Sequence, residues 1–262
     1  MIIDSHCHLD DSSFDEDRNE VLKRAREAGV DLLLAIGTGN GPPDLEAAVR
    51  LAAEHDFVYA TVGVHPHDAR KATPETYDRL AELCKHPKVL ALGEIGLDYH
   101  YDHSPRDTQR KVFIRQMEIA RQAGKPIVIH TREAWADTAA LLEEDWGSAG
   151  LGGIMHCFSG DAEQARQSLE LGFHISFAGV LTFAKAEELR QTATGVPMDR
   201  LLVETDAPYL TPAPFRKIRR NEPCYVVETA RKLAEIRGIS FEEVAKATTR
   251  NFLRLFDLPA PD

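Results

Sequence analysis

The sequence has few cysteines and no long apolar segment, and both shortages narrow the class of protein. Its four cysteines are widely spaced and form no CxxC pair, which argues against a disulfide framework or a zinc knuckle and favours a reducing compartment. No run reaches the roughly 18 apolar residues of a transmembrane helix. The N-terminus lacks a basic segment followed by an apolar one, so no signal peptide is expected. These absences predict a cytoplasmic protein with no membrane association.

Positive charge is also scarce. The formal net charge is −11, which argues against a broad basic surface that binds duplex nucleic acid by counterion release. It does not exclude an enzyme that takes a phosphodiester into a small site, because bound divalent ions would add positive charge that this count omits. A single basic cluster, residues 216–220, interrupts the acidic composition, and a solvated face is its ordinary interpretation.

No linker or low-complexity segment divides the chain, and short apolar runs alternate with longer amphipathic runs. The length and the 43% apolar content suit one large domain over residues 1–262. The expected strands are 1–3 continuing to 8, 31–36, 57–62, 126–130, 152–156, 174–177 and 201–206, and residues 89–98 are expected to form the fourth strand and its loop. The expected helices are 14–28, 44–54, 74–84, 106–123, 134–144, 161–171, 185–192, 222–237 and 240–256. Eight strand–helix units predict an α/β protein of the (β/α)8 TIM-barrel class. An open doubly wound sheet is the alternative, disfavoured because no GxGxxG turn follows the first strand.

Two histidines follow the first apolar run. Side chains two apart on a strand point to the same side, so His6 and His8 are expected to face one space. Neutral imidazole is a common metal ligand, and two such rings would form half of a ligand set. On the pair alone, two hydrogen-bonded core histidines are an equally good interpretation.

Residues able to bind metal also follow the other predicted strands. They are His65, Glu94, His130, His156 and Asp206, all at the strand ends where barrel enzymes place their chemistry. A single histidine in such a place is more often a hydrogen-bonded residue, but so many together indicate a metal centre. With His65 set aside, the six ligands are too many for one tetrahedral zinc and predict two divalent ions sharing a carboxylate. Their identity stays open among Mg, Mn, Zn, Fe and Co.

Neighbouring residues suggest supporting roles. Asp206 is a candidate proton acceptor as well as a ligand, and a pure ligand or a helix cap is its alternative. Glu204, two residues earlier on the same predicted strand, is expected to orient a ligand histidine or a water, with a buried ion pair as the alternative. Arg132 is a candidate phosphate-binding residue or a solvent-facing salt bridge. Asp98, His100 and Tyr101 are expected in a loop bordering the substrate, where a tyrosine can stack on a base or simply pack.

Several motifs together resemble the TatD family of metal-dependent hydrolases. They are residues 6–8 (HCH), 93–98 (GEIGLD), 129–132 (IHTR), 156–160 (HCFSG) and 204–209 (ETDAPY). The resemblance covers essentially the whole chain and implies an amidohydrolase-like barrel with metal-dependent deoxyribonuclease activity. It implies that His6, His8, Glu94 and Asp206 hold one ion, and that Glu94 bridges to a second ion held by His130 and His156. It also favours a role for His65 on the substrate phosphate or leaving group, with a capping or core residue as the alternative. His67 is a weaker substrate-binding candidate, for which an ordinary loop residue is the better interpretation.

The resulting hypothesis is a hydrolase that cleaves ester bonds of nucleic acid. The substrate would be single-stranded ends, attacked by water activated between two metals, with a 3'-5' exonuclease polarity that rests on the resemblance. An amidohydrolase-like barrel that cleaves an amide, lactone or ester of a small molecule is the alternative. A catalytically silent metal-binding protein is a more remote one, since a silent protein does not require a complete ligand set. No obligate protein partner is implied.

Overall fold

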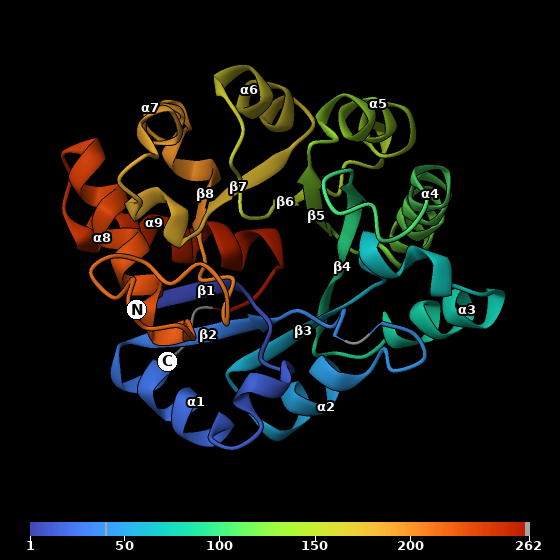
Figure 1. The fold of residues 1–262 in the computed structure, drawn as a ribbon, viewed down its shortest axis with the longest axis horizontal. Helices are drawn as coiled ribbons and strands as arrows, with labels where there is room; N and C mark the ends of the chain where they lie inside the picture. The colour runs from blue at the N-terminus through green and yellow to red at the C-terminus, as the bar shows by residue number, and fades with distance from the viewer. Residues whose placement is uncertain (40, 260–262) are drawn as a thin grey trace. The chain divides into compact units, whose positions relative to one another are not determined.

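The computed structural model describes residues 1–39 and 41–259, in which eight strands alternate with helices (Figure 1). The strands are β1 (Ile2–Cys7), β2 (Val30–Ala35), β3 (Val58–Val62), β4 (Val89–Asp98), β5 (Ile127–Arg132), β6 (Gly153–Met155), β7 (Phe173–Phe177) and β8 (Leu201–Val203). The α-helices are α1 (Arg18–Glu27), α2 (Ala47–Glu54), α3 (Pro74–Leu83), α4 (Arg106–Ala123), α5 (Trp135–Asp145), α6 (Ala162–Glu170), α7 (Glu187–Gly195), α8 (Val226–Arg237) and α9 (Phe241–Leu255). The strands are hydrogen-bonded in chain order, which confirms the predicted (β/α)8 class.

The chain divides into two compact units. The first comprises residues 1–34, 156–169 and 174–262, and the second comprises residues 35–155 and 170–173. That residues 1–262 form one hydrolase domain stays a prediction.

In the second unit, strands β3 to β6 form consecutive parallel pairs. Most of their side chains are apolar and buried, as expected of strands covered on both faces. Helix α4 lies along β4, which Figure 1 shows in green. Strand β4 is irregular in its pairing with β5: Gly93 lies opposite Val128 and Ile95 opposite Ile129, so Glu94 is the extra residue of a bulge. A bulge redirects a side chain, and here the redirected side chain is a carboxylate.

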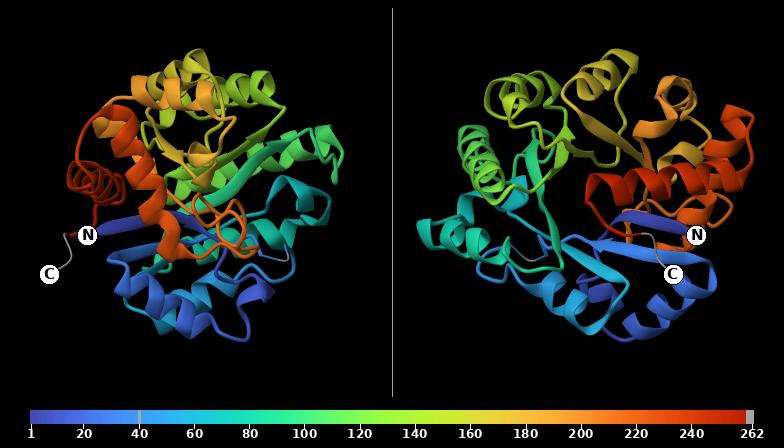
Figure 2. Two further views of the ribbon diagram at one scale, coloured as in Figure 1. Left: turned by 60° about the vertical axis from the view of Figure 1, so that its left-hand side comes forward. Right: turned by 180° about the vertical axis from the view of Figure 1, so that it is seen from behind.

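In the first unit, helix α9 packs on β1 and β8, and both views of Figure 2 show this red helix beside the blue first strand. Strands β7 and β8 are parallel. Just beyond β8, Ala207 forms a parallel bridge with Cys7 at the end of β1. The first and last strands therefore meet at the ends that carry the predicted ligands.

Several element boundaries differ from the sequence prediction. The helix expected over 14–28 begins at Arg18, because residues 12–14 form a 3-10 helix capped by the Asp11 side chain. The helix expected from residue 222 begins at Val226, after another short 3-10 turn. The strand expected over 201–206 ends at Val203. Among the described residues, no helix combines the length and apolar character that crossing a membrane requires.

Candidate metal centre

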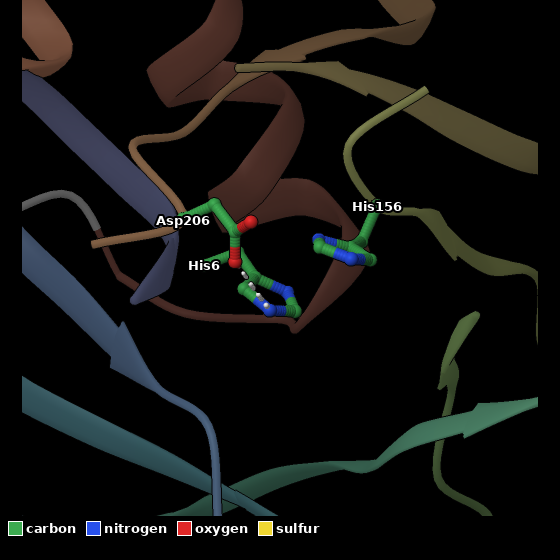
Figure 3. A group of neighbouring side chains, drawn as sticks. All are labelled: His6, His156 and Asp206. Atoms are coloured by element: carbon green, nitrogen blue, oxygen red, sulfur yellow. Dashed lines mark ion pairs between the residues drawn. The ribbon is translucent and has the colours of Figure 1, made fainter. Parts of the chain in front are cut away.

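In the first unit, His6, His156 and Asp206 point toward one another (Figure 3). One potential ligand atom from each lies within 4.8 Å of the others. The imidazoles of His6 and His156 stack with ring centroids 3.7 Å apart, and His6 Nε2 lies 3.7 Å from Asp206 Oδ1. Donors gathered at this spacing can bind one cation, so these residues fit a divalent metal ion.

His8 joins the same group, as its spacing from His6 predicts. Its Nε2 lies 3.3 Å from His6 Nε2 and 3.4 Å from Asp206 Oδ1. Burial alone would raise the pKa of Asp206, but the hydrogen bond from His8 and the nearby imidazoles of His156 and His6 lower it below its ordinary value. Asp206 is therefore ionised at neutral pH, the form that binds a metal or accepts a proton.

The loop after β8 places Asp206 by backbone contacts to β1. The Asp206 amide donates to His6 O at 2.9 Å, and the His8 amide donates to Ala207 O at 2.7 Å. Asp206 has φ of 57°, a left-handed conformation that a strand does not contain. The prediction that Glu204 and Asp206 lie on one strand is therefore wrong, because both follow its end.

Glu204 is fully buried and contacts His156. Its Oε1 lies 3.0 Å from His156 Nδ1 and accepts the Cys157 amide at 2.7 Å. A carboxylate at Nδ1 fixes the ring orientation and leaves Nε2 as the ligand-capable nitrogen. This is the contact that an orienting carboxylate makes. Within the described parts of the chain, Glu204 Oε2 has no hydrogen-bond partner.

Asp4, whose role was not predicted from the sequence, holds the backbone on both sides of this group. Its Oδ1 accepts the amides of Thr205 and His6, and its Oδ2 accepts the Thr205 hydroxyl at 2.5 Å. Burial raises the pKa of Asp4 to about 8, although these hydrogen bonds act in the opposite direction. An ionisable residue inside an apolar strand was the available signal, since such groups are rarely buried without partners.

In the second unit, His65, Glu94 and His130 also form a group of potential ligands within 4.8 Å of one another. Glu94 Oε1 lies 2.7 Å from His130 Nδ1 and 3.7 Å from His65 Nε2. The Glu94 side chain is 3% exposed, so water does not satisfy it fully. This group too fits a divalent ion in ligand type and spacing.

The side chain of His65 is 15% exposed to solvent. Its Nδ1 accepts the His67 amide at 3.1 Å, which assigns the proton of the neutral ring to Nε2. Burial lowers the pKa of His65 to about 4, with the nearby Glu94 opposing the shift. The ring is therefore neutral at pH 7 and presents an N–H on its Glu94 side.

Asp98 holds two imidazoles with one carboxylate. Its Oδ2 accepts from His67 Nε2 at 2.9 Å and from His130 Nε2 at 3.1 Å. Its Oδ1 accepts the amides of His100 and Tyr101. Burial opposes ionisation, but these hydrogen bonds hold the pKa of Asp98 far below its ordinary range. The expectation that Asp98 lies in a loop is wrong, because it is the last residue of β4, where it is buried.

The predicted substrate residues Arg132, Tyr101 and His67 lie next to this second group. The Arg132 guanidinium is 4.7 Å from the Tyr101 ring centroid, and the ring of His67 is 5.4 Å from it, edge to face. Arg132 lies on the exposed end of β5. The salt-bridge alternative for Arg132 is wrong, because no carboxylate in residues 1–39 or 41–259 forms an ion pair with it.

A (β/α)8 fold whose strand ends carry imidazole and carboxylate groups defines the class of metal-dependent barrel hydrolases. A family model described as TatD related DNase matches residues 3–257. The chain therefore belongs to the TatD family of metal-dependent hydrolases, as its motifs predicted.

Relatives match this chain over nearly their whole length. It is 44% identical to the uncharacterized metal-dependent hydrolase YabD of Bacillus subtilis, over 98% of this chain and 99% of that protein. It is 38% identical to the 3'-5' ssDNA/RNA exonuclease TatD of Pantoea vagans, over 98% of this chain and all of that protein. Among solved structures, the TatD homologue YjjV of Escherichia coli superposes with a TM-score of 0.91 at 30% identity, covering 98% of each chain.

Proposed function

We propose that this chain hydrolyses phosphodiester bonds at the ends of single-stranded nucleic acid. The observation that carries the proposal is the pair of imidazole–carboxylate groups, one in each unit, each with ligand atoms within 4.8 Å. The name of the Pantoea vagans relative supports the choice of substrate and, for polarity, a 3'-5' direction. The net charge of −11 supports an enzyme that takes in a strand end over one that grips a duplex.

The proposed centre holds two divalent ions. His6, His8, Glu94 and Asp206 would hold one, and Glu94 would extend to a second held by His130 and His156. This assignment rests on family membership and on the position of these residues at strand ends. It differs from the described grouping in one respect, because His156 lies with His6 and Asp206. Bound divalent ions supply two things to such a reaction: a lowered pKa for water and stabilisation of charge on the phosphate.

The chain's own residues would orient the groups and move protons. Asp206, kept ionised by its imidazole neighbours, would accept a proton from the attacking water. Glu204 and Asp98 would hold the rings of His156 and His130 in their binding tautomers. The neutral His65 would donate its Nε2 proton in a hydrogen bond to a phosphate oxygen or the leaving group.

The test is the shortening of an end-labelled single strand by purified protein with Mg or Mn. Wild type should shorten it, while His130→Ala should lose most of the activity. His55→Ala is the matched control, since His55 contacts Phe57 and belongs to neither group. An intact strand with every ion would contradict the proposal. Hydrolysis of an amide or lactone by the same preparation would then assign the centre to another bond.

A further inference from the structure

The loop after β4, residues 99–104, gathers aromatic rings at the molecular surface. Tyr101 is 49% exposed to solvent. Its ring lies parallel to the imidazole of His103, with an angle of 4° and centroids 5.5 Å apart. His67 and His100 meet the same ring edge to face, at 5.4 and 4.7 Å. These contacts hold Tyr101 in a defined orientation while leaving half of it open to solvent.

A cation without an ion-pair partner completes this surface. The Arg132 guanidinium is placed over the Tyr101 ring. The neighbouring exposed carboxylate, Glu133, pairs with His100 at 2.7 Å instead. Arg132 forms no ion pair with any residue that the structure describes, so its charge is available to an anion from solvent. A guanidinium is suited to a phosphate, which it can bind through two N–H groups.

The ring surface is attached directly to the second ligand group. Asp98 accepts the Tyr101 amide with one oxygen and the His130 ring with the other. It also holds His67, whose ring lies against both Tyr101 and His103. A molecule bound on the rings would therefore lie close to His130, one of the residues proposed to hold the metal ions.

We propose that Tyr101, His103 and Arg132 form a binding site for one unpaired nucleotide next to the cleaved bond. The nucleobase stacks on the rings and its phosphate binds Arg132. This inference deepens the proposed function and rests on it. Stacking on an aromatic ring tolerates any base, because every base has a π face, but it requires that the base be free of a duplex. The site thus selects single strands by base accessibility and not by sequence.

The test measures equilibrium binding of a fluorescent, phosphorothioate-linked oligothymidylate by anisotropy. Companion strands carry an abasic nucleotide at each of the terminal positions in turn. Wild type should bind the intact strand more tightly than one of the abasic strands, by about 5- to 150-fold, the range expected for one stacked base. Tyr101→Ala should lose this preference and Tyr101→Phe should keep it. Arg132→Ala should weaken binding to intact and abasic strands alike.

Tyr77→Ala is the matched control. Tyr77 lies on α3, also carries an arginine, Arg115, over its ring, and contacts neither ligand group. The Tyr77→Ala variant should bind the intact and abasic strands with the same affinities as wild type. The inference is overturned if wild type binds intact and abasic strands equally, or if Tyr101→Ala keeps the preference.

Cleavage of the unmodified strand separates the two proposals. If wild type cuts it but shows no stacking preference, the nucleotide site fails while the proposed function stands. If Tyr101→Ala loses the preference for the intact strand but no ion supports cleavage by wild type, the proposed function fails while the nucleotide site stands. If wild type does not bind the strand at all, both fail.

Discussion

Asp98 supports two imidazoles and the start of a loop with a single carboxylate. The GEIGLD motif includes Asp98, but the sequence does not indicate which residues this carboxylate contacts. Its partners His67 and His130 are 31 and 32 residues away along the chain. The same limit applies to Asp4, whose partner Thr205 is 201 residues distant. Ligand types at strand ends could be predicted from local patterns. The carboxylates that hold those ligands depend on contacts that only the folded chain creates.

Replacing Asp98 with asparagine should weaken metal binding. The variant removes the charge that accepts both ring N–H groups, so His130 loses its fixed orientation. We expect a loss of about 10- to 100-fold in metal affinity, the usual effect of removing a residue that orients a ligand. Calorimetric titration of Mn into metal-free protein measures it.

Asp102→Asn is the control for this experiment. Asp102 is exposed, lies in the same loop as Tyr101, and is paired with Arg106 at the start of α4. Its replacement should leave metal affinity unchanged. Equal affinities for Asp98→Asn and wild type would show that Asp98 does not orient His130.

Strands β4 and β8 show how elements place the ligands. The apolar runs in the sequence predict the residue at which each of these two strands begins, because a buried parallel strand is continuously hydrophobic. They could not predict the bulge at Glu94 or the end of β8 at Val203. Both follow from backbone contacts with a neighbouring strand: the Asp206 amide donates to β1, and Glu94 has no opposite residue on β5.

Gly96→Ala should disturb the pairing of β4 with β5. Gly96 has φ of 141°, and a Cβ there would lie 2.0 Å from the carbonyl oxygen of His130. We expect the free energy of unfolding to fall by at least about 1–3 kcal/mol, the strain of an unfavourable backbone conformation alone. Urea denaturation measures the change. Gly195→Ala, with no atom within 4 Å of the new Cβ, should have little effect; equal stabilities of the two variants would contradict this account.

Helix α1 is attached to the segment after β8 by Asp17, Arg24 and Arg220. The hydrogen bond from Arg220 lowers the pKa of Asp17 from 3.8 to about 2, against some desolvation. A carboxyl whose pKa is lower in the folded state than in the unfolded state stabilises the fold at pH values above its unfolded pKa. This contribution disappears as the pH falls toward its folded pKa. Asp17→Asn should therefore be less stable than wild type at pH 6, and the difference should shrink between about pH 4 and pH 2. Urea denaturation of both proteins at several pH values between 2 and 6 measures this difference. A difference in stability that is constant across these pH values would refute the ion pair between Asp17 and Arg220.

At the scale of the whole molecule, metal binding should stabilise the fold. Ions that bind the native state and not the unfolded one raise stability by mass action, by about 2.7 kcal/mol at a free concentration 100 times the dissociation constant. Adding a chelator should lower the thermal unfolding midpoint of wild type. The same treatment should lower it less in His130→Ala, which has lost a proposed ligand. Equal shifts in both proteins would remove His130 from the ligand set.

The (β/α)8 fold and the family could be predicted from the sequence because both depend on patterns spread along the entire chain. Eight apolar runs and the motifs around His6, Glu94, His130, His156 and Asp206 carry that information. The arrangement of ligands into groups could not, since sequence order does not specify side-chain contacts. His65, set aside from the ligand count, lies with Glu94 and His130 in the structure.

We propose that this chain acts on a nucleic-acid strand with two ions bound per molecule. The most direct test loads metal-free protein with Mn, removes unbound ions, and counts the bound ions by elemental analysis in the same samples that are assayed on an end-labelled single strand. The account predicts two ions per chain in protein that shortens the strand, and a lower count with little cleavage in His130→Ala and Asp206→Ala. Full cleavage by protein that holds one ion per chain, or two bound ions with no cleavage of any strand, would contradict it.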